Sequence, residues 1–374
     1  MEKPHVSRRL GLPLLWSLII IAIAGCQAPL DKRWQMLNGA IEAAIATNQI
    51  PGAVLLTTRD GEVILHRAYG FSDPLTQDPM QPNTLFRICS QTKAITSTAA
   101  LICWENGLLE LDDPVAKYIP SFASIGILDS LMADTTFSIL PAQNTLTIRH
   151  LMTHTSGIPY GEIGDPRYEK LYTKHDITDL FPRDERSTYD NADKIGQLAL
   201  AHEPGAQWTY SLGLDVLVAV IEIASGQPYA EFVEAEIFEP LGMEDTHFVV
   251  PGADRTRVAN VMERAPDGSS WQTHQHRDYT IDYPMHAEWP LCSGGAGLTS
   301  SASDYATFLQ MYLGRGEVGG VRVLQEATVD SVMADQAPGL VAGPWQQGLA
   351  FGVKSDSPGA GKFFWSALRK TKRV

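Results

Sequence analysis

The sequence predicts an α+β fold in which an antiparallel β-sheet is flanked by helices and a mostly helical segment interrupts the strands. Strand-like runs joined by turn signals lie near the start, at 54–58 and 63–69, and again near the end, at 348–354 and 362–365. From about 111 to 290 the chain is rich in helical patterns and loops, and strand-like runs are few. The helical segment is therefore expected as an insertion between early and late strands.

The N-terminus predicts export and lipid anchoring. A basic start precedes an apolar run over residues 10–24 that is shorter than a membrane-spanning helix. The residues after it resemble a bacterial lipobox ending at Cys26, which would become the lipid-bearing first residue. Gln27 follows this cysteine at the position where an aspartate would signal retention in the inner membrane, which favours an outer-membrane anchor facing the periplasm. We expect residues 1–25 to be a signal peptide and 26–374 the hydrolase domain; a plain signal peptide is the alternative.

Composition limits the partners of the chain. It has 374 residues, 44% of them hydrophobic, and a formal net charge of −14. The length is sufficient for a substantial core, and the acidic balance argues against nucleic acid and anionic membrane surfaces as partners. Besides Cys26, three cysteines remain, Cys89, Cys103 and Cys292, which cannot all pair. We expect buried free thiols, with no disulfide framework and no metal cluster.

The early elements lead to a serine at the start of a helix. Residues 31–48 have apolar side chains at helical spacing before a Pro-Gly pair, which predicts an amphipathic helix. The early strands flank an Asp-Gly pair at 60–61, which predicts a β-hairpin. The next helix is predicted to begin near Ser90 and to stop at the Asn-Gly pair 106–107.

Ser90 and Lys93 form a Ser-x-x-Lys pair on this helix. Residues three apart share a helical face, so we expect the Lys93 ammonium beside the Ser90 hydroxyl. The N-terminus of a helix also supplies unpaired N–H groups and a positive dipole end, which stabilise an oxyanion. Because so short a pattern often arises by chance, an ordinary serine cap is the alternative for the motif alone.

A short helix is predicted over residues 146–157, capped by Thr147 and stopped at Gly157. It carries His150 and His154 four residues apart, a spacing found in metal-binding pairs. The glutamate that zinc-protease helices place between their histidines is missing. We therefore expect no metal site here.

Tyr210 and a later glycine loop complete the set of candidate features. Tyr210 directly precedes a predicted helix over 212–223, and a side chain at such a junction can face a cleft. Tyr189 is a rival for the same role, but its polar, charged surroundings favour a loop. The glycine loop 294–297 lacks the lysine of a P-loop and the spacing of a dinucleotide fingerprint. We expect it to bring the backbone close to a cleft.

With Ser90, Lys93, Tyr210 and the glycine loop in this order, the chain resembles the penicillin-recognising serine hydrolases. These include class C β-lactamases, DD-peptidases and family VIII carboxylesterases, and the resemblance runs from about residue 34 to residue 365. It implies a β-lactamase/transpeptidase-like fold with an inserted all-α subdomain. It also implies that Ser90 is acylated, that Lys93 activates it, and that Tyr210 is the tyrosine of the second motif, with no cofactor needed.

The chemistry explains why these residue types occur together. A serine hydroxyl needs a nearby base, and a tyrosine, with an ordinary pKa of about 10, can serve only where a cation stabilises its phenolate. Lys93 could supply that charge, and whether Lys93 or Tyr210 takes the proton stays open at this stage. No Gly-x-Ser-x-Gly sequence occurs, so an α/β-hydrolase would have no nucleophile.

Two departures from the family pattern bear on the substrate. Class C β-lactamases and DD-peptidases usually have asparagine two residues after the tyrosine, where its amide contacts the substrate, whereas Leu212 offers no hydrogen bond. The third motif resembles the Trp-x-Gly box of family VIII esterases, running from Trp365 to Ala367, except for its last residue. We expect the backbone there to supply an oxyanion donor alongside the amide of Ser90.

The ending of the chain predicts a defect. A basic stretch reaches Val374 shortly after the third motif, where the family continues with further strands and a helix. We expect these C-terminal strands to be missing, with losses in stability and activity. The sequence thus favours a serine hydrolase of small carboxylic esters. One alternative is a β-lactamase or DD-peptidase, another is a catalytically impaired binding or vestigial homologue, and the oligomeric state is not indicated.

Overall fold

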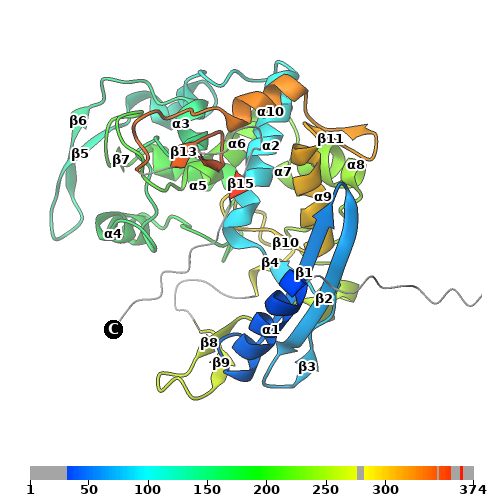
Figure 1. The fold of residues 1–374 in the computed structure, drawn as a ribbon. Coiled ribbons are helices and arrows are strands. Elements are labelled where there is room, and N and C mark those ends of the chain that lie inside the picture. The colour runs from blue at the N-terminus through cyan, green and yellow to red at the C-terminus, as the bar shows by residue number, and fades with distance from the viewer. Residues whose placement is uncertain (1–31, 276–281, 343–344, 355–362, 365–374) are drawn as a thin grey trace, which may run out of the picture.

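The computed structural model contains the mixture of helices and antiparallel strands expected of an α+β protein (Figure 1). The structure describes residues 32–275, 282–342, 345–354 and 363–364. The signal peptide, the proposed lipid anchor and the third motif from Trp365 to Ala367 lie outside the described residues, so these expectations stay predictions.

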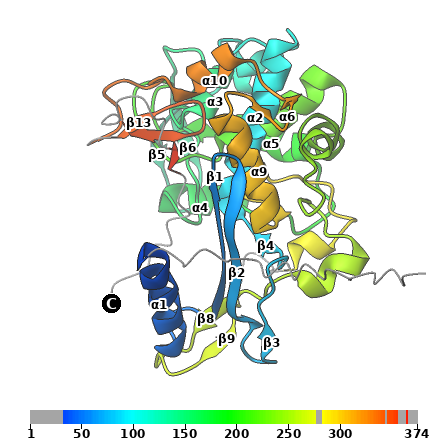
Figure 2. The same cartoon turned by 45° about the vertical axis from the view of Figure 1, so that its right-hand side comes forward.

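The N-terminal part is a helix beside a long hairpin (Figures 1 and 2). Helix α1 (Lys32–Ala46) precedes strands β1 (Gly52–Arg59) and β2 (Glu62–Asp73), and the short β3 (Asp78–Pro79) pairs with β2. Strands β1 and β2 are antiparallel, as predicted. At the turn, Asp60 has φ 52° and Gly61 has φ 85°, the left-handed conformations that an Asp-Gly hairpin turn requires.

A short strand pair fixes the start of the central helix. Strand β4 (Phe86–Arg87) pairs antiparallel with β10 (Thr299–Ser300). A single 3₁₀ turn, η1 (Cys89–Gln91), then runs directly into α2 (Thr92–Glu105). The prediction of a helix beginning near Ser90 and stopping before Gly107 is confirmed, with a tighter first turn. Because β10 follows the glycine loop, this pairing brings that loop beside Ser90.

The inserted segment is mostly helical, but it is not all-α as the family resemblance implied. Its longer helices and the turns beside them are α3 (Ile148–Met152), α4 (Pro166–Lys174), α5 (Thr188–Gly196), α6 (Gly213–Ser225), α7 (Tyr229–Val233), η4 (Glu234–Phe238) and α8 (Glu239–Leu241). Short 3₁₀ turns are η2 (Val115–Lys117), η3 (Pro120–Ser124), η5 (Gly252–Arg257) and η6 (Tyr283–Met285).

The described part of this segment also contains five strands. They are β5 (Gly126–Leu131), β6 (Phe137–Pro141), β7 (Ala199–Leu200), β8 (Met262–Arg264) and β9 (Trp271–Thr273). The β5–β6 hairpin projects from the helical part (Figure 1). Its strands are only six and five residues long, and most of β6 is exposed, so the sequence carries only a weak strand signal.

Tyr189 lies in a helix, so the prediction of a loop there is wrong. It belongs to the first turn of α5, where the Ser187 side chain accepts the N–H of Asp190. The side chain of Asn191 binds the backbone N–H and carbonyl of Thr178. These capping and loop contacts account for the polar residues that suggested a loop.

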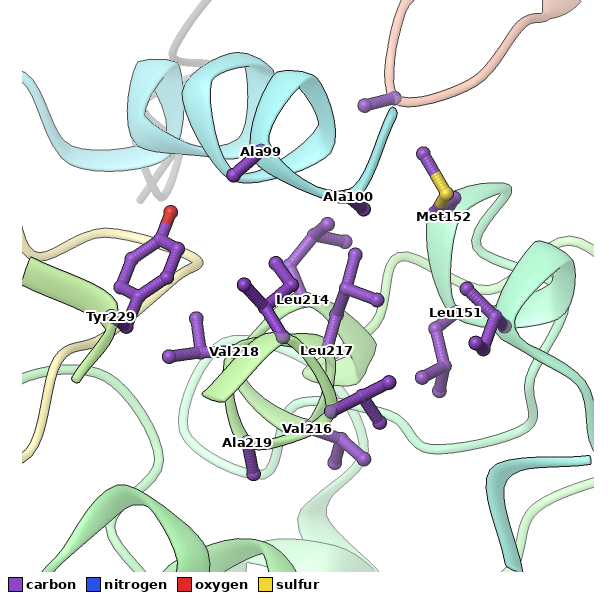
Figure 3. Close-up of a cluster of buried hydrophobic side chains, with 14 of the residues drawn as sticks. Ala99, Ala100, Leu151, Met152, Leu214, Val216, Leu217, Val218, Ala219 and Tyr229 are labelled. Atoms are coloured by element: carbon purple, nitrogen blue, oxygen red, sulfur yellow. The ribbon is translucent and has the colours of Figure 1, made fainter. Parts of the chain in front are cut away.

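Helices α2 and α6 cross at the centre of the hydrophobic core (Figure 3). Ala99 and Ala100 of α2 face Leu214, Leu217 and Val218 of α6, and all five side chains are fully buried. Small residues on one helix allow the larger ones on the other to approach closely, which makes a rigid support for the residues at the start of α2.

No single helix in the described part of the chain is long and apolar enough to cross a membrane. Helix α6 and the segment Tyr229–Leu241, bent by 81° at the break between them, pass this test only as a pair, by length and composition.

The C-terminal part begins with α9 (Ala302–Leu313), β11 (Glu317–Val318), β12 (Val321–Arg322) and α10 (Glu326–Met333). Strands β13 (Trp345–Gln347), β14 (Gly352–Lys354) and β15 (Phe363–Phe364) then pair antiparallel. The predicted pairing of the last two strands is confirmed, although the strand expected from residue 348 begins at Gly352.

Among the described residues, β13 to β15 form a sheet separate from β1 to β3, in contrast to the single sheet expected. The turn before β14 is tied to the helical part instead. Leu349 N–H donates to the carbonyl of Val332 (3.2 Å) and Ala350 N–H to that of Met152 (3.0 Å). These bonds direct the strands towards α3 and α10.

The expectation of buried free thiols is confirmed for two of the three cysteines. Cys103 and Cys292 are buried and free, and burial raises the pKa of each thiol to about 12. Cys89 is only half-buried, because it lies in the η1 turn next to Ser90.

The crossing of α2 and α6 yields a stability prediction. Replacing Leu217 with alanine leaves a cavity in this interface and should lower the free energy of unfolding by about 2–5 kcal/mol, measured by urea denaturation. The matched control is Ile223→Ala on the same helix, where the side chain is 43% exposed. Equal losses for both variants would contradict the packing described.

Candidate active site

Ser90 and Tyr210 are joined by a hydrogen bond. The Tyr210 hydroxyl donates to Ser90 Oγ over 2.8 Å, although the two residues are far apart in sequence. Ser90 is half-buried in the η1 turn. The residue before it, Cys89, has φ 46°, a left-handed conformation that is uncommon without glycine and typical of functional sites. The turn thus presents the serine hydroxyl to the tyrosine.

Lys93 lies one helical turn further along and is 1% exposed. Its ammonium donates to the carbonyl of Gly295 (2.7 Å) and to the hydroxyl of Tyr160 (2.9 Å). It also lies 4.8 Å from the ring centre of Tyr210 and 5.1 Å from that of Tyr160. Hydrogen bonds and cation–π contacts together offset the cost of burying this charge.

Tyr160 was missed by the sequence reasoning. It is 1% exposed and stacks on Tyr210, with ring centres 5.5 Å apart and an interplanar angle of 27°. A β-bridge between Pro159 and Ser211 aligns the two backbone segments and so places the tyrosines side by side. Burial raises the pKa of Tyr160 well above its ordinary value, so its hydroxyl stays neutral and accepts from Lys93.

His154 holds the segment that carries Tyr210. Its Nδ1 accepts the N–H of Ser211 (3.1 Å), and its carbonyl accepts the N–H of Thr209 (2.8 Å). Its ring centre lies 4.8 Å from that of Tyr210. Burial, assisted by the charge of Lys93, lowers the pKa of His154 to about 3. The imidazole is therefore neutral at physiological pH and acts as an acceptor at Nδ1.

The two histidines of the 146–157 stretch have separate roles. His150 Nδ1 accepts the N–H of Thr147 (3.2 Å) at the start of α3, whereas His154 reaches Ser211. Within the described residues, no group of three or more His, Cys, Asp or Glu side chains could hold a metal ion.

The glycine loop makes a close backbone approach, and the group that it approaches is the buried ammonium of Lys93. A Cβ on Gly295 would lie 2.4 Å from the Tyr160 hydroxyl, 2.6 Å from Asp215 Oδ2 and 3.1 Å from Lys93 Nζ. Only glycine fits between these groups. Asp215 is a second residue that sequence reasoning missed, although a lone acidic residue in the otherwise apolar start of α6 was an available signal.

Leu212 follows Tyr210 at the N-cap of α6 and is fully buried. Its side chain belongs to the hydrophobic core, and its N–H donates to the carbonyl of Ile158 (3.0 Å). The position that carries asparagine in class C β-lactamases therefore offers no side-chain hydrogen bond here.

Together, the described residues place a serine hydroxyl against a tyrosine beside a buried cation. A serine hydroxyl, a neighbouring group able to exchange a proton and a fixed positive charge are the parts that acyl transfer requires. The amides at the start of η1 and α2 lie next to Ser90, where a tetrahedral oxyanion would form.

Comparison with known proteins agrees with this geometry. Residues 37–370 match the model of the Beta-lactamase family, and the chain therefore belongs to that family. The chain is a serine hydrolase with the β-lactamase/transpeptidase-like fold.

Particular relatives narrow the comparison. The chain is similar to esterase EstB of Burkholderia gladioli, with 32% identity over 335 residues, covering 87% of this chain and 80% of EstB. It is 29% identical to monacolin J acid methylbutanoyltransferase of Aspergillus terreus over 312 residues, covering 79% and 69% of the two chains. The structure of EstCE1, a hydrolase with promiscuous acyltransferase activity, matches with a TM-score of 0.71 and 27% identity, covering 86% and 83%.

The close approach at Gly295 yields a testable prediction. In Gly295→Ala, the methyl group must displace Tyr160, Asp215 or Lys93, and misplacing a catalytic group by about 1 Å can cost about 100-fold in rate. We expect a loss of this order in kcat/KM on a p-nitrophenyl ester. The control is Gly39→Ala in α1, where an added Cβ meets nothing within 4 Å. Full activity in Gly295→Ala would contradict the geometry.

The neutral state of His154 predicts a pH dependence of stability. Its pKa is about 3 when folded and 6.5 ordinarily, so the unfolded chain takes up a proton first as the pH falls. Lowering the pH from 6.5 to 5 should therefore reduce the free energy of unfolding of the wild type by about 1.6 kcal/mol more than that of His154→Gln.

Urea denaturation of wild type and His154→Gln at several pH values measures this difference. His175→Gln, at the exposed end of α4, is the control for removing a histidine outside the cluster. A gap between wild type and His154→Gln that stays constant with pH would contradict a buried neutral imidazole.

Proposed function

We propose that this chain hydrolyses small carboxylic esters through an acyl-enzyme on Ser90. The observation that carries the proposal is the 2.8 Å hydrogen bond between Tyr210 and Ser90, beside the Lys93 ammonium, which lies 4.8 Å from the Tyr210 ring. A serine hydroxyl, a proton acceptor and a fixed positive charge are the parts that acylation needs.

In the proposed reaction, Tyr210 acts as a phenolate whose negative charge is stabilised by Lys93, and it takes the Ser90 proton as Oγ attacks the ester carbonyl. The tyrosine, now neutral, then passes this proton to the departing alcohol and becomes a phenolate again. The oxyanion is held by the amide of Ser90 and, as we propose, by the backbone between Trp365 and Ala367. Water activated by the same tyrosine then releases the carboxylic acid and restores Ser90.

Two observations favour esters over β-lactams and peptides. The buried Leu212 leaves no side-chain amide to bind the amide group of a β-lactam or peptide. The similarity to esterase EstB covers most of both chains. A β-lactamase or DD-peptidase activity is the alternative that substrate comparison must exclude.

Acyl transfer is a second candidate activity. The relatives described above include a methylbutanoyltransferase and a hydrolase with acyltransferase activity. An acyl-enzyme on Ser90 passes its acyl group to an alcohol instead of water whenever the alcohol occupies the position of the attacking water. Formation of a new ester when an alcohol is added to the assay would support this activity.

We further propose that the chain is exported and anchored to the periplasmic face of the bacterial outer membrane through a lipid on Cys26. The basic start, the short apolar run and the lipobox-like residues support this. Metabolic labelling with radioactive palmitate in a bacterial host should mark the wild type but not Cys26→Ala. Equal labelling of both would contradict the anchor.

The catalytic proposal predicts the outcome of a substrate panel. Wild type should cleave p-nitrophenyl butyrate faster than a chromogenic cephalosporin, with an initial burst of nitrophenol when deacylation is slow. Tyr210→Phe should lose about 100-fold or more in kcat/KM, because proton transfer contributes about that much. Ser90→Ala should show no initial burst of nitrophenol.

Two results would contradict this proposal. Faster turnover of the cephalosporin would favour a β-lactamase. A folded wild-type chain that turns over neither substrate would favour the catalytically impaired alternative. Circular dichroism of each variant establishes that the chains compared are folded.

A further inference from the structure

Among the described residues, the groups in direct contact with the Lys93 ammonium carry no full negative charge. Its hydrogen bonds go to the Gly295 carbonyl and the neutral Tyr160 hydroxyl, and two aromatic rings lie beside it. Burying an unpaired charge costs free energy, and a carboxylate nearby offsets part of that cost. The function proposed for Lys93 requires that it stay charged.

Asp215 of α6 is a buried carboxylate that can balance the charge of Lys93. It is 7% exposed, and its Oδ1 accepts the hydroxyl of Ser293 over 2.8 Å. Its Oδ2 and Lys93 Nζ both lie against Gly295, at 2.6 and 3.1 Å from the position that a Cβ would take. The carboxylate and the ammonium therefore face each other across the glycine.

Within the described part of the chain, the other titratable groups that act on this carboxylate do not supply a second cation. Those that act on Asp215 electrostatically are Lys93 from α2, Tyr160 and Asp179 from the loops on either side of α4, and Tyr229 from α7. Burial raises the pKa of both tyrosines above 10 and that of Asp179 to about 8. Lys93 is thus the cation of this set, and at neutral pH the other three are neutral.

We propose that Asp215 is the buried counter-charge of Lys93 and positions it for the proton transfer at Ser90. Asp215 acts through Lys93 and is a positioning residue. The inference rests on the proposed function, because it explains how the charge that assists Tyr210 is maintained.

Ionisation of Asp215 gives this role a pH signature. Burial raises the pKa of Asp215 to about 6, while Lys93 and the Ser293 hydroxyl oppose the shift. Above this pH the carboxylate is charged and supports Lys93. As the pH falls below it, Asp215 is protonated, Lys93 loses its counter-charge, and kcat should fall.

The first experiment measures kcat and KM of wild type and Asp215→Asn on p-nitrophenyl butyrate as a function of pH. In the variant, kcat should fall about 10- to 100-fold at pH 7.5 with KM within about threefold, since the carboxylate does not touch the substrate. Wild type should lose kcat as the pH falls through about 6, and the variant should not show this loss. A variant with wild-type kcat and the same acid limb would overturn the proposal.

Two further variants test whether the acid limb of the kcat profile comes from Asp215. Ser293→Ala removes a hydrogen bond that favours the ionised carboxylate, so the acid limb should move to higher pH; an unmoved limb would count against the proposal. Asp304→Asn is the matched control, because it removes a buried carboxylate bound to Thr246 and Asp245. It should lower the melting temperature and leave the acid limb in place.

A stability measurement separates this inference from the proposed function. If Asp215 and Lys93 stabilise each other, Asp215→Asn combined with Lys93→Met should lower the melting temperature by less than the sum of the two single shifts. This outcome does not depend on turnover. Additive shifts would overturn the pairing, whereas coupled shifts in a chain without esterase activity would overturn only the proposed function.

Discussion

The buried ammonium of Lys93 is the constraint on which the rest of the site depends. A cation that is 1% exposed must be satisfied by the protein, and here three separate segments do so. Tyr160 contributes a hydroxyl and a ring, Tyr210 contributes a ring, and Gly295 contributes a carbonyl. Each segment must approach α2 closely, which explains the glycine at the point of contact.

Backbone pairing brings these segments together. The β4–β10 pair places the glycine loop beside the η1 turn, and the bridge from Pro159 to Ser211 places the two tyrosines side by side. His154 then fixes the residues on both sides of Tyr210 through its ring and its carbonyl. The geometry of the reacting groups is thus set by local hydrogen bonds around a rigid helix crossing.

Local patterns in the sequence sufficed to predict much of this arrangement. The hairpin at residues 60–61, the helix after Ser90 and the closeness of the glycine loop follow from turn signals and spacing. The contacts of Tyr160, His154 and Asp215 depend on packing between segments far apart in the chain, which no local pattern encodes. The β5–β6 hairpin was missed because its strands are only six and five residues long, and the separation of β13–β15 from β1–β3 depends on long-range hydrogen bonds.

Covalent labelling measures most directly whether Lys93 activates Ser90 as a nucleophile. Intact-mass analysis of the chain from residue 27 onward, treated with a fluorophosphonate, should show one adduct that Ser90→Ala lacks. Lys93→Met keeps an unbranched side chain one atom shorter and removes its charge, so its labelling should be at least about 100-fold slower. Labelling of Ser90→Ala, or wild-type labelling rates in folded Lys93→Met, would contradict an active site built around this buried charge.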